Sequence, residues 1–297
     1  MKVAITGGSG FVGRALADRL EEPVVISRRS GTDITDVDAL TAAFAGCDAV
    51  AHCAGINREI GDQTFRRVHV EGTAAVVEAA RRAGVRRLVM VSFLRARPDC
   101  GSAYHESKWE AEEIIRGSGL PHTILKSGMI YGPGDHMVDH VTRAVRTLPF
   151  FWTVGYRERT ARPVPVEDAA DVLVAALEGR IPEPTVAVMG ADEVTLGEAI
   201  RRIARVAGRR PAFLPVPAWV VRVLAQLTEW TMVVPLVAKA QARMLAEGVS
   251  EPAPWAPEPP EGIRPSRPFD DDRIRAALPT GRFGLSDLRL VRALRIA

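Results

Sequence analysis

The feature that most constrains this chain is a glycine-rich segment that follows its first apolar run. Residues 2–6 form a short run typical of a buried strand, and the segment Gly7-Gly8-Ser9-Gly10-Phe11-Val12-Gly13 comes next, just before a helical pattern. Glycines accept positive φ angles in a tight turn and let a backbone approach a ligand closely. The N–H groups that begin the following helix would face a phosphate. The segment therefore predicts a strand, a turn and a helix that hold the pyrophosphate of a dinucleotide.

The glycine spacing is a weak signal by itself, and its context gives it weight. Gly7, Gly10 and Gly13 satisfy G-x-x-G-x-x-G, and Gly8, Gly10 and Gly13 satisfy G-x-G-x-x-G, between a strand-like run and a helical pattern. The alternative is a glycine-rich turn without a ligand. The candidate cofactor-binding residues of this segment are Gly7, Gly8, Ser9, Gly10, Phe11, Val12 and Gly13.

Short apolar runs alternate with helical patterns through the first half of the chain. The expected strands are 2–6, 23–27, 48–53, 87–93 and 122–126, and the expected helices are 11–20, 37–44, 64–83 and 103–116. The runs are continuously apolar, as in strands covered on both faces. This order predicts an α/β fold, a Rossmann doubly wound parallel sheet.

The alternation weakens after Tyr131-Gly132-Pro133-Gly134. Further strands are expected at 162–166 and 185–189, further helices at 167–177 and 196–207, and an extended strap in the proline-rich residues 251–268. We expect an NAD(P)-binding domain over residues 1–178, with 135–160 contributing to a substrate lobe, and a smaller C-terminal substrate or cover region over 179–297.

Composition excludes several classes of protein. The formal net charge of +3 is small and no basic stripe is evident, which argues against nucleic acid. Three cysteines without a C-x-x-C pair favour a reducing compartment, and the six histidines form no metal-ligand pattern. The N-terminus lacks the pattern of a signal peptide, and charged residues and a proline interrupt the apolar stretch 217–238. We therefore expect a cytoplasmic protein that binds no metal.

The residues at the end of the second expected strand indicate whether the chain binds NAD or NADP. NAD enzymes usually place an acidic residue there for the ribose 2′-hydroxyl, whereas this chain has Ser27-Arg28-Arg29. Arginine suits a 2′-phosphate because its N–H groups can bind two phosphate oxygens. The sequence favours NADP, with NAD as the alternative if both arginines are simply solvated. Farther on, Asp33-Ile34 could accept from the adenine amine and cover the adenine face, or Asp33 could cap a helix, a role that Asp36 fits better.

Tyr104 and Lys108 are spaced to share one face of an expected helix. An ammonium near the phenol would lower the pKa of Tyr104, so that it could act as general acid or base. The pattern Y-x-x-x-K is common on surfaces, but here it follows the fourth expected strand, where the cofactor would lie.

The motifs together resemble the short-chain dehydrogenase/reductase superfamily. They are TGGSGFVG at 6–13, DI at 33–34, HCAG at 52–55, VS at 91–92, YHESK at 104–108 and GMIYGPG at 128–134. The resemblance covers residues 1 to about 178 and is to the extended and atypical branches, which include NAD-dependent epimerases and dehydratases. The chain is also similar to the NADPH-binding accessory subunit of respiratory complex I.

The resemblance implies roles for particular residues. Tyr104 would be the catalytic acid/base and Lys108 its partner, which also binds the nicotinamide ribose. Cys53, Ala54 and Gly55 would pass close to the cofactor. Ser127 and Met129 would lie beside the nicotinamide.

Two positions depart from the superfamily pattern. The superfamily often has a Ser-Ser pair that orients the substrate, whereas Ser92 here precedes Phe93, so that Ser92 is either catalytic or the end of a strand. His69 replaces an asparagine that supports a water relay, and it either holds the same water or is a satisfied core histidine.

These observations favour an NADP-dependent oxidoreductase that transfers hydride to or from a small-molecule substrate. A nucleotide-sugar epimerase or dehydratase is one alternative, and a non-catalytic NADPH-binding sensor or assembly subunit is another. The apolar region from Trp219 to Trp230 could form a peripheral contact or a homodimer interface.

Overall fold

The computed structural model describes residues 1–154, 159–231 and 247–281. The chain forms two compact units, each assembled from three stretches of sequence. The first, here called the sheet unit, comprises Met1–Gly128, Val164–Met189 and Glu251–Arg267. The second unit comprises Met129–Pro163, Gly190–Ser250 and Pro268–Ala297.

A six-stranded sheet, parallel throughout, forms the centre of the sheet unit. In the order β10-β5-β4-β3-β1-β2, its strands are Thr185–Val188, His122–Ser127, Arg87–Phe93, Ala49–His52, Lys2–Thr6 and Glu22–Ile26. The chain moves outward from β1 in opposite directions, to β2 on one side and to β3 on the other. Ligands of such sheets bind outside the carboxyl ends of the strands at this reversal. The predicted doubly wound Rossmann sheet is confirmed.

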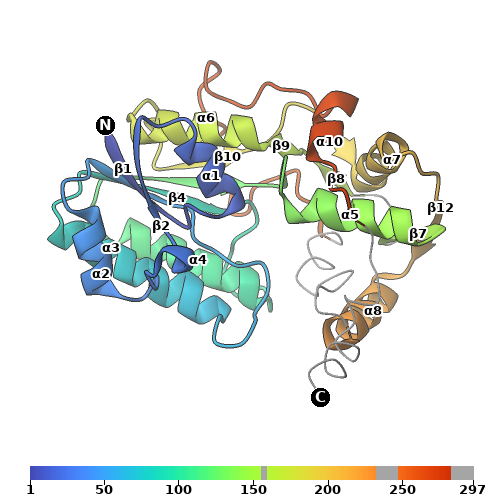
Figure 1. Ribbon diagram of the computed structural model, residues 1–297, viewed down its shortest axis with the longest axis horizontal. Helices are drawn as coiled ribbons and strands as arrows, with labels where there is room; N and C mark the ends of the chain where they lie inside the picture. Colours follow the sequence, from blue (N-terminus) through green and yellow to red (C-terminus); the bar gives the residue numbers. More distant parts are fainter. Residues whose placement is uncertain (155–158, 232–246, 282–297) are drawn as a thin grey trace. The chain divides into compact units, whose positions relative to one another are not determined.

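Helices cover both faces of this sheet, which is why its strands are continuously apolar. Helices α1 (Phe11–Ala17) and α6 (Val166–Leu177) lie on one face, and α2 (Val37–Phe44), α3 (Gly72–Arg82) and α4 (Ala103–Arg116) lie on the other (Figure 1). All four residues of β3 are buried. Burial of these apolar side chains away from water supplies the main stabilisation of the layers.

Several predicted elements have the observed bounds, and one is more complex than predicted. Residues 37–44, 87–93 and 103–116 form α2, β4 and α4 as expected. The expected helix 64–83 is instead a π-helical turn over Arg66–Glu71 that continues into α3. Such turns insert an extra residue into a helix and are frequent at functional sites. His69 lies in this turn.

The proline-rich strap is an extended segment of the sheet unit. It has no regular helix or strand over residues 251–267, as predicted. The Ala187 N–H of edge strand β10 donates to the Pro257 carbonyl over 2.7 Å, and the Ala253 N–H donates to the Leu94 carbonyl over 3.0 Å. The observed units therefore differ from the expected boundary after residue 178, because β10 and the strap belong to the sheet unit.

The second unit has its own elements and core. Among its described residues, the helices are α5 (His136–Thr147), α7 (Leu196–Val206), α8 (Ala218–Thr231) and α10 (Asp271–Ala277). Its strands are β6 (Ile130–Tyr131), β7 (Phe150–Val154), β8 (Thr160–Ala161), β11 (Val194–Thr195) and β12 (Ala212–Val216). Strand β7 pairs with β12 in parallel, and β8 pairs with β11 antiparallel. Tyr131, Ile203 and Phe269 are among the residues of its buried core.

The expected strand 162–166 is wrong in extent. Only Val164–Pro165 forms a strand, β9, and α6 already begins at Val166. Proline has no backbone N–H for a ladder, so Pro163 and Pro165 limit the strand to two residues.

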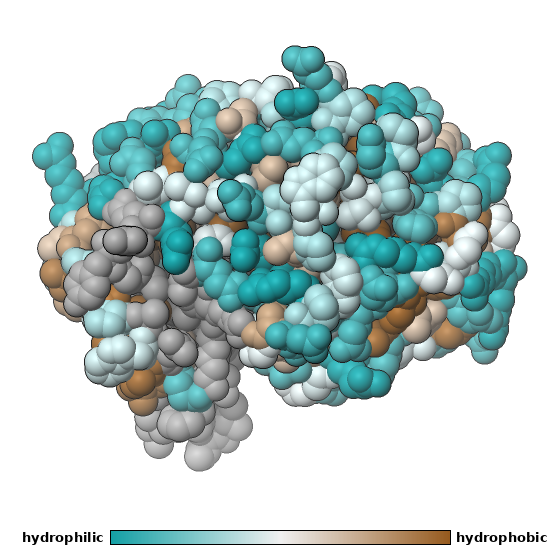
Figure 2. Space-filling view, turned by 180° about the vertical axis from the view of Figure 1, so that it is seen from behind, coloured by the Kyte–Doolittle hydropathy of each residue, from teal (hydrophilic) through white to brown (hydrophobic). Residues whose placement is uncertain are grey.

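Apolar side chains on α8 are exposed along one line of the helix. Trp219, Val223 and Leu227 follow at intervals of four residues and are 64%, 51% and 47% exposed, whereas Val221 and Ala225 are buried. The side chain of Trp230 lies outside the described residues, and the expected apolar contact stays a prediction. On the face that Figure 2 shows, brown apolar residues lie in small groups among teal hydrophilic ones. Within the described residues, no helix combines the length and hydropathy needed to cross a membrane.

Candidate dinucleotide site

The glycine turn has room for a ligand but not for side chains of its own. Gly7 has a φ of 71°, and a Cβ there would lie 2.7 Å from both the Cα and the N of Ala54. A Cβ on Gly13 would lie 2.7 Å from the Gly8 Cα and still closer to the Gly7 carbonyl oxygen. Helix α1 starts after Gly10 without a hydrogen bond from a capping side chain. Its first N–H groups need acceptors, and a pyrophosphate fits this cradle.

The loop after β3 brings Cys53, Ala54 and Gly55 against the same turn. The Cys53 N–H donates to the Thr6 carbonyl over 3.0 Å, which continues the register of β1 and β3. A Cβ on Gly55 would lie 3.1 Å from Lys108 Nζ. The glycine turn, this loop and Lys108 therefore lie close together at the reversal of strand order.

Two buried histidines connect this loop to the neighbouring elements. Thr73 Oγ1 donates to the His69 carbonyl, so it accepts from His52 Nε2 over 3.0 Å, and His52 Nδ1 accepts from Thr6 Oγ1 over 2.7 Å. Since burial keeps His52 neutral, its single ring proton is on Nε2 and Nδ1 acts as the acceptor. Burial, assisted by the charge of Lys108, lowers the pKa of His52 to about 3.

His69 has the opposite tautomer. Its Nε2 accepts the Ile56 N–H over 3.1 Å, and its Nδ1 donates to Ser107 Oγ over 2.9 Å, while Ser107 donates to the Tyr104 carbonyl. Burial first, and then the charge of Lys108, lowers the pKa of His69 well below 6.5. Of the two roles considered for His69, the structure shows a core histidine whose ring nitrogens bind Ile56 and Ser107.

Tyr104 lies among aromatic rings, and this reverses the expected effect on its acidity. Its ring contacts those of Phe65, His69, Phe93 and His105 at centroid distances of 5.4–5.8 Å. Burial raises the pKa of Tyr104, so the predicted lowering by Lys108 is wrong. Burial is the cause of this rise, and the Lys108 ammonium donates to the Val91 carbonyl over 3.3 Å.

Lys108 is itself buried, and burial changes its acidity. Desolvation lowers its pKa to about 8, while Glu112, and then Cys53 in its thiolate form, act in the opposite direction. The Cys53 thiol is affected in turn, because burial raises its pKa to about 12. The pKa of Lys108 therefore lies well below the usual value for a lysine.

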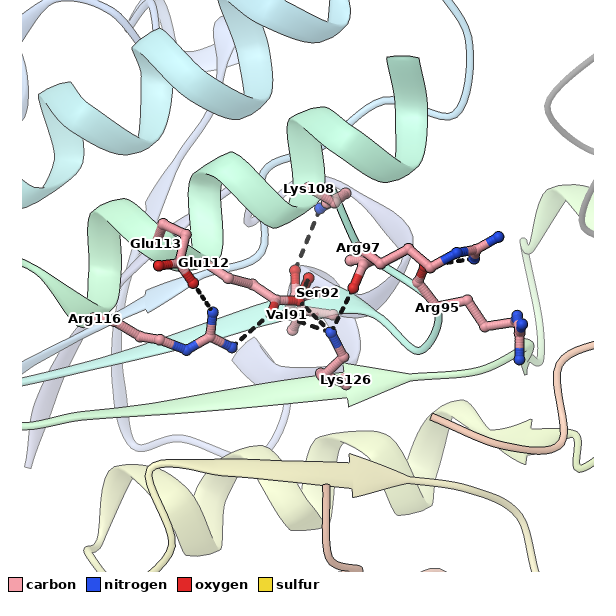
Figure 3. A network of polar contacts seen from close by, with 10 residues as sticks. Val91, Ser92, Arg95, Arg97, Lys108, Glu112, Glu113, Arg116 and Lys126 are labelled. Carbon is pink, nitrogen blue, oxygen red and sulfur yellow. Dashed lines mark hydrogen bonds and ion pairs between the residues drawn. The ribbon is translucent and has the colours of Figure 1, made fainter. Parts of the chain in front are cut away.

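Ser92 belongs to a buried ion cluster (Figure 3). Its hydroxyl donates to Glu112 Oε1 over 2.5 Å, and Lys126 Nζ lies 3.0 and 3.1 Å from the two Glu112 oxygens. Arg116 donates to Glu112 Oε2 over 2.8 Å, and Lys126 also donates to the Ala96 carbonyl. Ser92 thus orients a carboxylate within the sheet unit, a role that the sequence did not suggest.

Ser127 ends β5 at the carboxyl edge of the sheet with an unsatisfied hydroxyl. The side chain is 4% exposed, and nothing in the described part of the chain hydrogen-bonds its Oγ. A buried polar atom without a partner is costly, and a carboxamide could satisfy it. This fits the expected place beside the nicotinamide. Met129 belongs to the second unit, and its role stays a prediction.

Arg28 and Arg29 form an exposed turn directly after β2. Ser27 and Ser30 close the turn through reciprocal side-chain hydrogen bonds to each other's N–H groups. Both arginines are exposed, and neither has an ion-pair partner within the described ranges. They are therefore available to an anionic ligand.

Asp33 has partners within the chain. The Thr35 N–H and hydroxyl donate to its Oδ1, Arg67 donates to its Oδ2, and these interactions, that of the Thr35 N–H foremost, lower its pKa. Asp36 caps α2 by accepting the Ala39 N–H, as expected. Ile34 packs against Gly72, where a Cβ would lie 3.0 Å from its side chain.

Sequence reasoning missed Glu112, His52 and Lys126. Glu112 follows Lys108 by four residues, so the helical spacing that paired Tyr104 with Lys108 could have found it. Nothing local indicates that Lys126 would meet it, because they lie on different elements.

The fold and this geometry define a dinucleotide-binding protein of the Rossmann type. A protein family described as NAD(P)H-binding matches residues 26–180. The ceramide reductase of Caulobacter vibrioides is 31% identical over 238 residues, which cover 72% of this chain and 73% of that protein. The chain belongs to this NAD(P)H-binding family, and it is similar to relatives named as epimerases, such as the bovine epimerase family protein SDR39U1, which is 26% identical over 253 residues.

Two further comparisons agree with this assignment. A Stigmatella aurantiaca ketoreductase, named for a 4-hydroxy-2-methyl-3-oxo-4-farnesyl-3,4-dihydroquinoline-1-oxide substrate, is 28% identical over 289 residues, covering 83% of this chain and 85% of that protein. The UDP-glucose 4-epimerase of Thermus thermophilus, solved in complex with NAD, superposes with a TM-score of 0.65 at 21% identity, covering 93% of this chain and 97% of the epimerase. At this identity the epimerase shows the fold alone.

Proposed function

We propose that this protein is an NADP-dependent reductase of carbonyl compounds, with Tyr104 as the proton donor. The observation that carries the proposal is the meeting of Lys108 with the Gly55 loop beside the glycine turn, one helical turn from Tyr104. Bound NADPH would supply the hydride to the carbonyl carbon. Tyr104 would donate its proton to the carbonyl oxygen, which yields the alcohol.

The chemistry of the site suits reduction. Burial keeps the Tyr104 phenol protonated at neutral pH, as a proton donor requires. Lys108, whose ammonium lies close to Gly55, would bind the nicotinamide ribose. Reductase and ketoreductase names among the relatives support this direction.

The relatives' names also suggest a class of substrate. Ceramide and a farnesyl quinoline both combine polar groups with a long apolar chain. We therefore propose a ketone or aldehyde attached to a long hydrocarbon chain as the substrate to test first, beside short-chain carbonyl compounds.

The central test is turnover of NADPH with this panel of carbonyl compounds. Tyr104→Phe should abolish turnover and leave NADPH affinity within about twofold, because it removes only the phenolic hydroxyl. Unchanged turnover in Tyr104→Phe would remove Tyr104 from the mechanism.

The preference for NADP is tested by titration with NADPH and NADH. Replacing Arg28 and Arg29 with glutamine should weaken NADPH binding about tenfold or more and leave NADH binding unchanged, because hydrogen bonds between ions contribute about 1.5–3 kcal/mol. Arg86→Gln is the matched control, since Arg86 is exposed and directly precedes β4, at the amino ends of the strands rather than their carboxyl ends. Tighter binding of NADH by the parent protein would refute the preference.

A non-catalytic NADPH-binding protein is the second candidate, and the position of Ser92 favours it. The Ser92 hydroxyl is bound to Glu112, so it does not offer the substrate contact that reductases of this superfamily often have. Stoichiometric NADPH binding that stabilises the protein, without turnover of any carbonyl compound, would support this candidate.

A further inference from the structure

A fully buried carboxylate lies one helical turn from Lys108. The Glu112 side chain is 0% exposed and Lys126 is 1% exposed, while Arg116 is 30% exposed. Burying a charge is expensive unless partners satisfy it, and here two cations and the Ser92 hydroxyl do so. The two cations are held in turn by Trp109, whose ring lies 4.9 Å from the Arg116 guanidinium and 5.5 Å from Lys126 Nζ.

Lys108 and Glu112 bind consecutive residues of the same strand. Lys108 Nζ donates to the Val91 carbonyl, and Glu112 accepts from the Ser92 hydroxyl. Both side chains extend from α4 toward Val91 and Ser92, near the end of β4 (Figure 3). The carboxylate is thus fixed next to the ammonium by contacts that do not include the ammonium itself.

We propose that Glu112 is a positioning residue that keeps the buried Lys108 ammonium charged and in place for the cofactor. Lys126, Arg116 and Ser92 hold the Glu112 carboxylate where its field reaches Lys108. The consequence for cofactor binding rests on the proposed function, whereas the effect on Lys108 does not.

The other titratable groups that face Lys108 come from three elements. They are Tyr104 on α4, Cys53 and His52 at the end of β3, and His69 in the π-helical turn. Burial disfavours the charged form of each of them, so they are neutral at neutral pH. Glu112 therefore supplies the negative charge that opposes the desolvation of Lys108.

The experiment measures the titration of Lys108 directly in the full-length protein. Competitive acetylation of lysine amines from pH 6 to 11, followed by peptide mass spectrometry, gives the midpoint for Lys108. In Glu112→Gln this midpoint should fall by about one pH unit, because the variant removes the negative charge that favours the ammonium. Glu113→Gln is the matched control, because Glu113 is the next residue and also pairs with Arg116, but it is 52% exposed. In Glu113→Gln the labelling midpoint of Lys108 should stay at the parent value.

The double variant Glu112→Gln/Lys126→Gln covers the case in which the single variant does not fold. It removes both charges of the closest pair, so no uncompensated partner of that pair remains buried. The Lys108 midpoint should fall in this variant as well. An unchanged midpoint in whichever of the two variants folds would overturn the proposal, as would an equal fall in Glu113→Gln.

Dinucleotide titration over the same pH range separates this inference from the proposed function. If the parent binds NADPH or NADH, its affinity should decline as the pH rises and Lys108 loses its proton. In Glu112→Gln this decline should begin at a lower pH than in the parent. A decline at the same pH in both proteins overturns the proposed coupling to the cofactor. If the parent binds neither dinucleotide, the proposed function fails, and the labelling midpoint still decides the role of Glu112.

Discussion

Acidification from pH 7 to pH 5 should destabilise the sheet unit through His52 and His69. Both rings are 1% exposed and neutral, and their hydrogen bonds use each ring nitrogen in a fixed role. An unfolded chain takes up a proton at each histidine near pH 6.5, whereas the folded chain does not, since burial depresses both folded-state pKa values. The stability present above pH 6.5 is therefore lost as the pH falls below it.

The magnitude follows from the number of protons. Each histidine that stays neutral in the folded chain lowers the free energy of unfolding by about 1.4 kcal/mol for every pH unit of acidification, once the pH is well below 6.5. Between pH 7 and pH 5 this amounts to about 2 kcal/mol for each residue and about 4 kcal/mol for the two together. Asp135 of the second unit acts in the opposite direction, because burial raises its pKa to about 6.

Urea unfolding from pH 5 to 8.5 measures this loss, and variants isolate each histidine. His69→Gln and His52→Gln keep a donor and an acceptor at each position but cannot take up a proton. Each should lower the pH dependence of the unfolding free energy between pH 6 and 5 by about 1.2 kcal/mol per unit. The contribution of Asp135 is common to parent and variant, so it cancels in the difference. Parent and variant should run parallel from pH 7.5 to 8.5, and a variant that keeps the parent slope below pH 6 would refute the neutral state of that histidine.

Three further predictions concern the turn, the end of β5 and the strap. Gly13→Ala should reduce dinucleotide affinity at least tenfold in a calorimetric titration, because its Cβ would collide with backbone atoms of the turn. Ser127→Ala should raise the unfolding free energy by about 1 kcal/mol while weakening dinucleotide binding several-fold, whereas Thr123→Val, which also removes an unsatisfied buried hydroxyl, should stabilise without changing affinity. Asp168→Asn should cost about 2 kcal/mol and expose the strap to protease, since Asp168 accepts from the backbone and the guanidinium of Arg267; an unchanged cleavage rate would contradict this.

Local patterns were sufficient for several of the elements and for the glycine turn. Strand and helix bounds such as 87–93 and 103–116 follow from apolar runs and helical periodicity, which depend on neighbours within a few residues. The spacing of Tyr104 and Lys108 placed both on one helix for the same reason. The turn was predictable because its glycines, strand and helix are contiguous in sequence.

Only the tertiary structure decided what surrounds the reactive groups. The rings around Tyr104, which raise its pKa against expectation, come from β4, α4 itself and the segment around the π-helical turn. Ser92, Glu112 and Lys126 come from β4, α4 and β5, and the strap joins the sheet from residues 251–267. Such contacts depend on how crossovers stack distant segments, so no local pattern encodes them. Sequence alone therefore determined that a dinucleotide turn and a Tyr–Lys helix exist, and packing determined which protons these residues hold.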